Sequence, residues 1–312
     1  MIAEVKAHTD NKHWIIRRKS GLPLGTKVLP AVWAMRRKRR ITSGEPYKWK
    51  ARLNLHGGKQ EHGINYWETY APVIGWTTIR LFLILTLLNG WASRQIDFVL
   101  AYPQADIECT MYMEIPRGFT FNGSRRTHCL ELVKNLYGQK QAGRVWNVHL
   151  HEGLLARGFV QSKADMCLYY RGTVAMLIYT DDGILIGPTA EDIDDVIRIL
   201  QVPAGKSKEF RAFNITDEGD LCDYLGVKVE RMANGLIKLS QPHLIQQVVD
   251  DLGFNERTTS KSTPAASTVK LSRDVHGQSY EEKWSYRSVI GKLNFIEKST
   301  RPDLAYAVHQ CA

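Results

Sequence analysis

Cysteine is scarce in this chain, and long apolar runs are absent. Only five of its 312 residues are cysteines, and no two are spaced as C-x-x-C, which argues against a disulfide framework and against a zinc knuckle. That usage fits a reducing intracellular setting. The most apolar stretch, LFLILTLLNGW from Leu81 to Trp91, is shorter than the ~20 residues that a membrane-spanning helix needs. The polar start, MIAEVKAHTDNKHW, carries no secretory signal, so no membrane partner is expected.

Acidic residues are also fewer than basic ones. The chain has 32 Asp and Glu against 42 Lys and Arg, a formal net charge of +10, and 44% of its residues are hydrophobic. That hydrophobic share is typical of a globular protein with a large core. The charge favours an acidic polymer as partner, with nucleic acid as the first candidate. An ordinary basic protein is the alternative that charge alone leaves open.

The basic residues are concentrated between Trp33 and Lys59. In that segment RRKRR at 36–40 is followed by four further basic residues, and Glu45 alone opposes them. The stretches KVLPAVWAM and YKWKARLNLH alternate like strands around a Gly-Pro turn. This pattern predicts a basic hairpin that meets phosphates. A solvated charged turn and a nuclear-import patch are the alternatives.

Periodicity predicts an α+β chain. Helices are expected over 77–89, begun by Thr77 or Thr78, and over 143–159, 191–200, 242–252 and 286–297, with an apolar helix after them. Strands are expected over 94–102, 111–116, 129–138, 165–171 and 175–187, and ANG at 233–235 predicts a hairpin. A Ser/Thr-rich connector is expected over 255–268. HTDNKH, from His8 to His13, has no cysteine in register for a metal site and is interpreted as surface.

Three carboxylates interrupt apolar strands. Asp181 and Asp182 lie side by side in LIYTDDGILIGP, and Asp97 lies in the distant QIDFVLAY. Unpartnered buried carboxylates are costly, and neighbouring ones repel. A hard divalent cation, Mg²⁺ or Mn²⁺, offsets both the cost of burial and the repulsion. Two such ions can stabilise the attacking and leaving oxygens of a phosphoryl transfer. We expect Gly183 to bend the hairpin so that both aspartates reach one edge. The alternative is an ordinary Asp-Asp-Gly turn.

These motifs resemble those of reverse transcriptases. YTDDGILIG resembles their Y-x-D-D box, and QIDFVLAY resembles their first aspartate motif. The order and setting are similar to the copia-type (pseudoviral) retrotransposon group. Further stretches carry the same resemblance over roughly residues 4–312: YKWKARLNLHGGKQEHGINYWETYAPV, TTIRLFLILTLLNGW, MYMEIPRGF, LYGQKQAGRVWN, YLGVKVE and YRSVIGKLNFIEKSTRPDLAYAV.

The resemblance implies a right-hand polymerase fold of fingers, palm and thumb, with an antiparallel palm sheet packed on helices. Approximate bounds are fingers at 1–72 and 104–145, palm at 73–103 and 146–230, and thumb at 231–285. Residues 286–312 are then the start of a connection segment. In this family an integrase domain precedes and a ribonuclease H domain follows, so we expect both as partners within one polyprotein.

The resemblance also assigns site residues. Asp97, Asp181 and Asp182 are implied as the catalytic carboxylates and, with the backbone carbonyl of Phe98, as ligands of two Mg²⁺ (or Mn²⁺) ions. The implied nucleotide-binding residues are Lys50, Arg52, Tyr102 and Gln141. Among these, Arg52 suits phosphate because its planar fork pairs with phosphate oxygens, and Tyr102 matches the aromatic that selects deoxynucleotides. The implied primer-binding residues are Thr180, Tyr224, Leu225 and Gly226.

Some residues depart from the family pattern. Gly143 stands where Pro is usual, and Gly183 stands where a branched aliphatic is commoner. The chain reads LNLHGGKQ where a small residue, then Lys or Arg, and a Gly-aromatic pair are expected. None of these changes removes a carboxylate. These departures concern the detail of the expected nucleotide pocket more than the metal-dependent chemistry of the carboxylates.

The sequence thus predicts an RNA-directed DNA polymerase domain of a retrotransposon polyprotein. It would extend a primer 3′-hydroxyl on an RNA or DNA template from dNTPs. A cytoplasmic virus-like particle with access to the nucleus is the expected location. The alternatives are a decayed copy that binds nucleic acid without polymerising, a two-metal nuclease, and a basic structural protein. The intact carboxylates argue against the first, Tyr102 and Gln141 against the second, and carboxylates inside apolar strands against the third.

Overall fold

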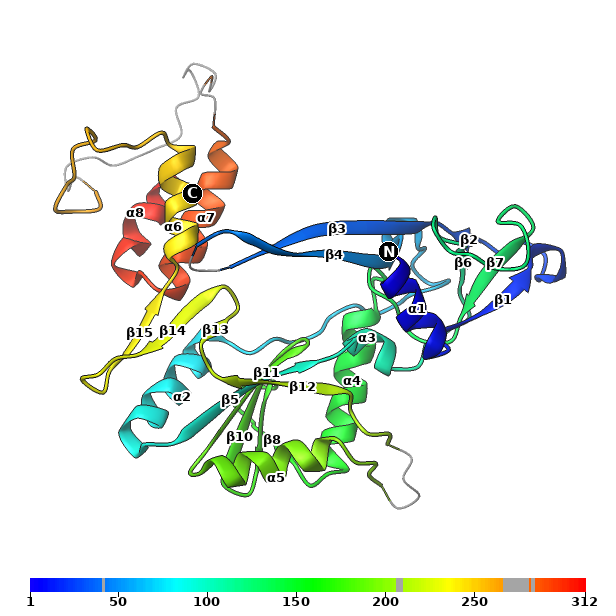
Figure 1. Cartoon of the computed structure of the whole chain (residues 1–312), viewed down its shortest axis with the longest axis horizontal. Helices are drawn as coiled ribbons and strands as arrows, with labels where there is room; N and C mark the ends of the chain where they lie inside the picture. Colours follow the sequence, from blue (N-terminus) through cyan, green and yellow to red (C-terminus); the bar gives the residue numbers. More distant parts are fainter. Residues whose placement is uncertain (41–42, 206–209, 266–280, 282–283) are drawn as a thin grey trace. The chain divides into compact units, whose positions relative to one another are not determined.

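The computed structural model describes residues 1–40, 43–205, 210–265, 281 and 284–312 (Figure 1). It divides into two compact units, one of residues 1–38 and 48–221 and the other of residues 39–47 and 222–312. The expected thumb and the Ser/Thr-rich connector extend into 266–280 and 282–283, which lie outside the described residues. The same holds for 41–42 in the expected fingers and 206–209 in the expected palm.

A six-stranded sheet forms the centre of the first unit. All its neighbouring strands are antiparallel, in the order β12-β5-β11-β10-β9-β8. In chain order the strands are β5 (Ala92–Phe98), β8 (Val160–Gln161), β9 (Leu168–Arg171), β10 (Val174–Tyr179), β11 (Asp182–Gly187) and β12 (Ile215–Asp220). The apolar runs of β10 and β11 are buried along their length, as expected for strands covered on both faces.

Helices cover both faces of this sheet. They are α2 (Trp76–Asn89), α4 (Ala142–Leu155) and α5 (Ala190–Leu200). Phe98 of β5 packs its ring on Trp146 of α4, with centroids 5.2 Å apart. Asp97 precedes Phe98 on β5, so its side chain lies on the opposite face of the sheet, because side chains alternate along a strand. On that opposite face Tyr170 of β9 meets Phe82 of α2, with ring centroids 6.4 Å apart.

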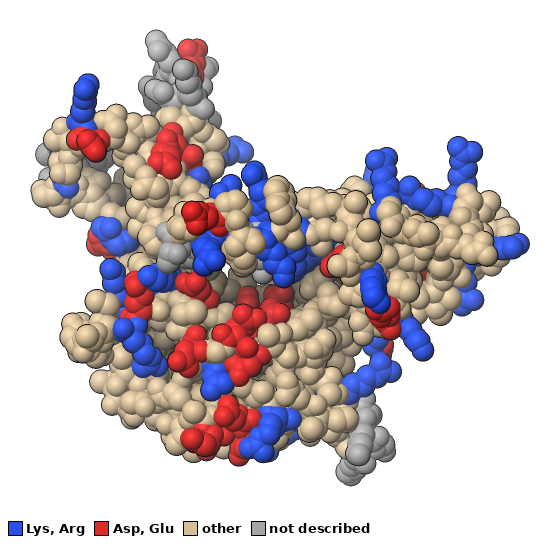
Figure 2. Space-filling view, in the orientation of Figure 1, with Lys and Arg blue, Asp and Glu red and all other residues tan. Residues whose placement is uncertain are grey.

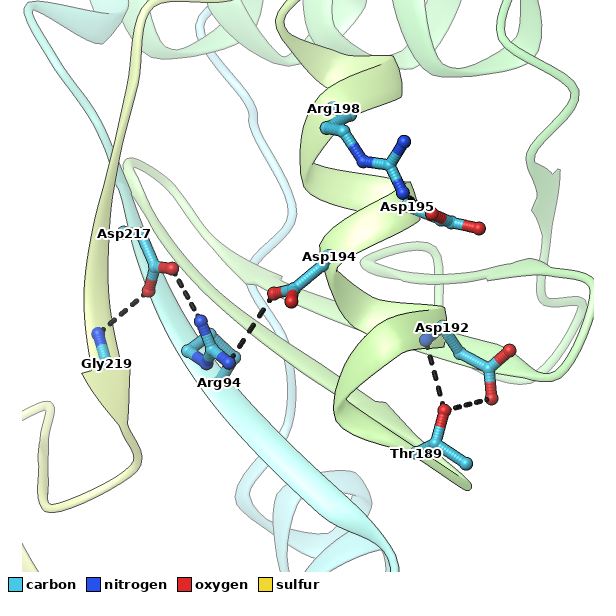
Figure 3. A network of polar contacts seen from close by, with 8 residues as sticks. All are labelled: Arg94, Thr189, Asp192, Asp194, Asp195, Arg198, Asp217 and Gly219. Carbon is cyan, nitrogen blue, oxygen red and sulfur yellow. Dashed lines mark hydrogen bonds and ion pairs between the residues drawn. The ribbon is translucent and has the colours of Figure 1, made fainter.

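An ion-paired arginine ties the edge of the sheet to a helix (Figure 3). Arg94 of β5 donates to Asp217 of β12 at 2.6 Å and lies 3.5 Å from a carboxylate oxygen of Asp194 on α5. Near the start of α5, the Thr189 side chain accepts from the Asp192 backbone N–H at 3.1 Å, which caps the helix. These contacts fix α5 against the face opposite to Asp97.

A second, four-stranded sheet completes the core of the first unit. Its order is β1-β7-β6-β2, with β2 and β6 parallel. Its elements are β1 (Trp14–Arg18), β2 (Val28–Leu29), β6 (Tyr112–Glu114) and β7 (His128–Leu132). The first unit also contains α1 (Ile2–Asp10), α3 (Ala101–Gln104) and the short 3₁₀ turns η1 (Lys19–Gly21) and η2 (Gly57–Lys59). Its buried core includes Trp14, Leu53, Met113 and Leu130.

A long hairpin of β3 (Ala31–Arg39) and β4 (Pro46–Leu55) contributes to both units. The second unit contains the tip of this hairpin, a three-stranded sheet and a set of helices. Its elements are β13 (Asp223–Tyr224), β14 (Val227–Arg231), β15 (Ile237–Ser240), α6 (Pro242–Asp251), α7 (Tyr286–Ser299), η3 (Pro302–Leu304) and α8 (Ala305–Cys311). Val248, Val289 and Ile296 form its small apolar core.

The α+β class, with an antiparallel sheet packed on helices, is confirmed. So are the basic hairpin and the helices expected near 77–89, 191–200 and 242–252. The expected cap at Thr77 or Thr78 is wrong, because α2 begins earlier: Gly75 is its N-cap, and the Thr78 hydroxyl donates to Asp165 at 2.7 Å. No helix among the described residues is long and apolar enough to cross a membrane.

The strand expected over 94–102 ends early. β5 stops at Phe98, and Leu100 takes a left-handed conformation (φ 51°) that starts α3. Tyr102 therefore lies on a helical turn. A non-glycine residue at positive φ is uncommon, so the alternating sequence pattern gave no sign of this break.

The interpretation of HTDNKH as surface is wrong for its two histidines, whereas residues 9–12 between them are exposed as expected. His8 is fully buried and His13 is 6% exposed. Their Nδ1 atoms are 2.8 Å apart, and the His8 ring stacks on Trp14 at 5.2 Å. Burial, helped by the nearby His8 and Lys134, lowers the pKa of His13 to about 4. The His13 ring is therefore neutral at neutral pH.

This burial makes stability depend on pH. Because the folded-state pKa of His13 lies below its ordinary value of 6.5, the unfolded chain binds the proton more readily between about pH 6.5 and pH 4. The stabilisation is present above pH 6.5 and is lost as the pH falls through this range, by at most about 3 kcal/mol. Urea unfolding from about pH 7.5 to pH 5 should show a shallower decline for His13→Phe than for the wild type. His62→Asn, at an exposed histidine, should retain the wild-type decline.

Candidate active site

Strand pairing brings Asp97 and Asp182 together. β11 runs antiparallel to β5, and Asp182 is the direct cross-strand partner of Asp97. Side chains of directly opposed residues lie on the same face of a sheet. The two carboxylates therefore share one face, although their strands are far apart in the sequence.

Asp181 lies in the adjoining hairpin turn. Tyr179 pairs with Asp182, so Thr180 and Asp181 form a two-residue loop between β10 and β11. Thr180 has a φ of 60°, which is unfavourable for a β-branched residue. Two hydrogen bonds hold this turn: Trp146 Nε1 donates to the Thr180 carbonyl at 2.7 Å, and the Phe98 N–H donates to the Asp181 carbonyl at 2.8 Å.

Gly183 does not bend the hairpin, contrary to the prediction. It lies within β11, opposite Ile96, and the turn is made by Thr180 and Asp181. A Cβ added at Gly183 would stand 2.9 Å from Cγ1 of Ile96. Glycine at this position makes room for Ile96.

The three carboxylates face a cavity of about 680 Å³ within the first unit. Basic side chains of the β3–β4 hairpin line it too, together with polar and aromatic residues. The lining consists of Asp97, Asp181, Asp182, Arg36, Arg37, Lys50, Arg52, Ala34, Asn54, Tyr102, Tyr137 and Gly138. Figure 2 shows acidic side chains gathered over the central sheet and basic ones along the hairpin, with a hollow between them. The cavity thus has both an acidic and a basic side.

Two tyrosines connect these sides. The Arg52 guanidinium lies 3.9 Å from the centre of the Tyr137 ring, and the Tyr137 and Tyr102 rings are 4.9 Å apart. Burial raises the pKa of Tyr102, with a further rise from the Asp181 carboxylate. Burial also raises the pKa of Tyr137, with smaller rises from Asp181 and Asp97, while Arg52 opposes the shift in both tyrosines. Both hydroxyls thus stay protonated at neutral pH and can donate hydrogen bonds.

The donor set fits a hard divalent cation by chemistry. Asp97, Asp181 and Asp182 offer only oxygen ligands, which Mg²⁺ and Mn²⁺ prefer. Within the described part of the chain, however, no group of three or more His, Cys, Asp or Glu side chains is gathered closely enough to hold a metal ion. The three carboxylates therefore line one cavity, but they would have to draw closer to share an ion. Phe98, whose carbonyl is the further expected ligand, directly follows Asp97 at the end of β5.

The other expected residues are divided between several places. Lys50, Arg52 and Tyr102 line the cavity. Gln141 does not: it is 1% exposed, and its side-chain amide accepts from Gln60 at 3.0 Å. Thr180 lines a smaller adjoining cavity of about 100 Å³, together with Tyr102.

The expected primer-binding hairpin lies in the second unit. Tyr224 pairs with Val227, so Leu225 and Gly226 form a two-residue turn between β13 and β14. Both turn residues have positive φ, 51° and 80°, as in the turns that suit the twist of a hairpin. The Tyr224 ring is buried, at 1% exposure.

Sequence reasoning missed Tyr137 and Gly138. They follow β7 in the LYGQKQAG stretch, where only Gln141 was singled out. The Leu55 N–H donates to the Tyr137 carbonyl at 2.9 Å. A Cβ on Gly138 would stand 2.3 Å from the Leu55 carbonyl oxygen, and one on Gly57 would stand 2.1 Å from that of Gly138. This backbone contact brings Tyr137 beside Arg52, and the two glycines in LHGG and LYG were its only sequence signal.

Arg36, Arg37 and Asn54 were also missing from the expected site. The two arginines belong to the RRKRR run, which was interpreted as a phosphate-binding hairpin without assignment to the nucleotide pocket. Their place in the cavity lining depends on how far β3 extends beside β4, which local sequence does not encode.

Comparison with known proteins gives consistent matches. Residues 12–267 match the family described as "Reverse transcriptase (RNA-dependent DNA polymerase)". The Retrovirus-related Pol polyprotein from transposon RE1 of Arabidopsis thaliana is 31% identical over 99% of this chain and 20% of that polyprotein. The corresponding polyprotein from transposon TNT 1-94 of Nicotiana tabacum is 31% identical over 92% of this chain and 22% of its own length. The chain thus spans about a fifth of the length of these relatives.

A solved structure is also similar. The foamy viral protease-reverse transcriptase in complex with double-stranded DNA aligns with a TM-score of 0.46 and 11% identity. The alignment covers 95% of this chain and 40% of that one.

The contact between Gly183 and Ile96 can be tested by a mutant cycle. Gly183→Ala is expected to lower the free energy of unfolding by about 1–3 kcal/mol, because the new Cβ presses on Ile96 inside a close-packed sheet. In an Ile96→Ala background the same change should cost less, since the obstructing atom is gone. Urea unfolding of the wild type, both single variants and the double variant measures the coupling. Gly21→Ala, where a Cβ meets nothing within 4 Å, is the control; equal costs in both Ile96 backgrounds would contradict the steric account.

Proposed function

The chain belongs to the reverse transcriptase (RNA-dependent DNA polymerase) family, in the copia-type group of retrotransposon Pol polyproteins, and we propose that it catalyses template-directed DNA synthesis from dNTPs. The observation that carries the proposal is the shared cavity, in which Asp97 of β5, Asp182 of β11 and Asp181 of the turn before β11 face a basic hairpin. Nucleotidyl transfer needs both sides, one to gather metal ions at the reacting oxygens and one to hold the triphosphate.

The carboxylates have the metal-binding role in this proposal. Asp97 and Asp181 are the principal ligands of two Mg²⁺ (or Mn²⁺) ions, Asp182 completes the set, and the Phe98 carbonyl is a further ligand. When bound, such ions lower the pKa of an attacking 3′-hydroxyl and neutralise charge on the leaving pyrophosphate. The hairpin turn holds Asp181 beside the Asp97–Asp182 pair. Binding of the ions offsets the repulsion between the three side chains.

The basic side of the cavity holds the nucleotide. Arg52 pairs its planar fork with phosphate oxygens, and Lys50 adds a point charge. The Tyr102 ring lies under the sugar and excludes a 2′-hydroxyl. Gln141 was expected to line the same pocket; in its buried position it contributes by supporting the pocket wall through Gln60 rather than by contact. That support is part of the proposal.

The proposal extends to the architecture of the parent protein. Fingers at 1–72 and 104–145, palm at 73–103 and 146–230, and thumb at 231–285 follow the family pattern, with a connection segment from 286. Thr180 and the Tyr224–Gly226 turn contact the primer. An RNA or DNA template-primer, integrase and ribonuclease H domains of the same polyprotein are the partners. A cytoplasmic virus-like particle with nuclear entry is the location.

Primer extension tests the chemistry. On a homopolymer RNA template with Mg²⁺, the wild type should extend a labelled primer, whereas Asp181→Asn should lower the rate by at least about a thousandfold, because a metal ligand is lost. Asp195→Asn is the matched control. It makes the same charge change on α5, where the Asp195 carboxylate pairs with Arg198, and it should extend normally. Template affinity should be equal in all three proteins.

Three results would contradict the proposal. A wild type that binds template and never extends would identify a non-catalytic copy. Shortening of the labelled template would identify a nuclease. An Asp181→Asn variant as active as the Asp195→Asn control would show that the Asp181 carboxylate is not needed for primer extension.

The Arg52–Tyr137 contact predicts a graded effect on nucleotide binding. Arg52→Lys should raise the KM for dNTP about tenfold with a smaller change in kcat, because an ammonium cannot form the bidentate contact or stack in the same way. Tyr137→Leu should have a similar but weaker effect, because the guanidinium loses the ring that orients it. Tyr137→Phe keeps that ring and should resemble the wild type. Steady-state kinetics with one varied dNTP distinguish these cases; a KM unchanged in both Arg52→Lys and Tyr137→Leu would contradict the assignment.

A further inference from the structure

Trp49 is exposed on the outer surface of the β3–β4 hairpin. Its side chain is 76% exposed, which is unusual for so large an aromatic. On β4 it alternates with Lys50 and Arg52, which line the catalytic cavity. Because successive side chains of a strand point to opposite faces, Trp49 points away from that cavity. It lies outside the site described above.

An arginine holds the ring of Trp49. The Arg37 guanidinium lies 5.5 Å from the centre of the Trp49 ring, and Arg37 also belongs to the cavity lining. Met35, two residues before Arg37 on β3, is 55% exposed and shares the outer face by alternation. The outer face thus offers an aromatic ring, a thioether and a guanidinium, beginning at the rim of the cavity.

The surroundings of this face are strongly basic. Between Trp33 and Lys59, Glu45 is the sole acidic residue in a run with nine basic ones. An exposed apolar patch on such a hairpin has charge complementarity for a polyanion and repels another basic surface. A second copy of this chain, at a net charge of +10, is therefore a poor occupant.

We propose that Trp49, steadied by Arg37, is a stacking platform for an unpaired base of single-stranded nucleic acid on the outer face of the β3–β4 hairpin. Bases stack on exposed aromatic rings without regard to sequence, and flanking cations follow the backbone. Arg37 contributes by cation–π contact with the same ring. A duplex cannot use the platform, since its bases are already stacked. Trp49 lies outside the cavity lining, which Arg37 shares, and stacking on its ring needs no chemistry in the cavity.

Binding of labelled oligonucleotides tests the platform. Fluorescence anisotropy with the whole chain, without nucleotides, compares a single-stranded oligo(U) of about ten residues with a duplex of equal length. Trp49→Ala should weaken oligo(U) binding about tenfold, the scale of one lost base–aromatic stack, with duplex affinity retained. The dependence of affinity on salt should be unchanged, because no charge is removed. Arg36→Gln, which removes a neighbouring charge, should instead flatten the salt dependence by about 0.7 in slope.

Two further variants serve as controls. Trp49→Phe keeps a ring and should stay within about threefold of the wild type. Trp67→Ala removes another exposed tryptophan, 51% exposed and outside the hairpin beside Glu68, and should bind oligo(U) as the wild type does. An equal loss in Trp67→Ala would show a general effect of exposed aromatics and overturn the assignment to the hairpin.

The proposal is overturned if Trp49→Ala binds oligo(U) with wild-type affinity, or if it loses single strand and duplex equally. Sedimentation addresses the protein alternative: a wild-type dimer that Trp49→Ala dissolves, with oligo(U) affinity intact, would assign the face to self-association. The result is separable from the polymerase proposal. A protein that never extends a primer but needs Trp49 for oligo(U) keeps the platform, and one that extends normally without needing Trp49 for binding loses it.

Discussion

The pairing of β5 with β11 is the constraint on which the site depends. It sets Asp97 directly opposite Asp182 in an antiparallel ladder, an arrangement in which like charges repel. The chain tolerates this pairing because the opposite face of the same strands is firmly packed. Phe98 lies at 1% exposure against Trp146, and its ring also meets Phe213 at 5.5 Å. The free energy that holds the acidic pair in place thus comes from apolar packing on the far face of the sheet.

The hairpin turn adds a second local strain. Thr180 is held at positive φ by the hydrogen bond from Trp146, the same side chain that packs on Phe98. One tryptophan on α4 therefore supports both strands that carry the acidic residues. Strained backbone of this kind persists where the surroundings over-determine it, and it is concentrated at functional sites. The basic side chains that line the same cavity offset part of the repulsion between the carboxylates.

Much of this arrangement could be predicted from sequence, for identifiable reasons. The α+β class followed from clear periodicities, and the family was recognised from ordered motifs that include the aspartates. The placement of Asp97 on the same cavity as Asp181 and Asp182 was expected from the cost of setting carboxylates inside apolar strands. Local pattern failed where the answer depended on long-range packing. Contacts with distant segments accompany each failure: the Val99 N–H donates to Asn214 beside the left-handed Leu100, the Val133 N–H donates to the carbonyl of the buried His13, and Gln60 engages Gln141. The turn itself was placed at Gly183 because glycine usually marks a bend, whereas here it marks crowding by Ile96.

The contact between the LHGG and LYG loops has an evolutionary consequence. Gly57 and Gly138 each face a carbonyl oxygen so closely that neither tolerates a Cβ without separation of the two backbones. A substitution at either glycine therefore requires a compensating change in the other loop, and we expect the two loops to vary together in evolution. A lineage that lost either glycine would have to reposition Tyr137, and with it the ring over which Arg52 lies. These two glycines, which contact no ligand themselves, would thereby constrain the shape of the pocket wall in related proteins.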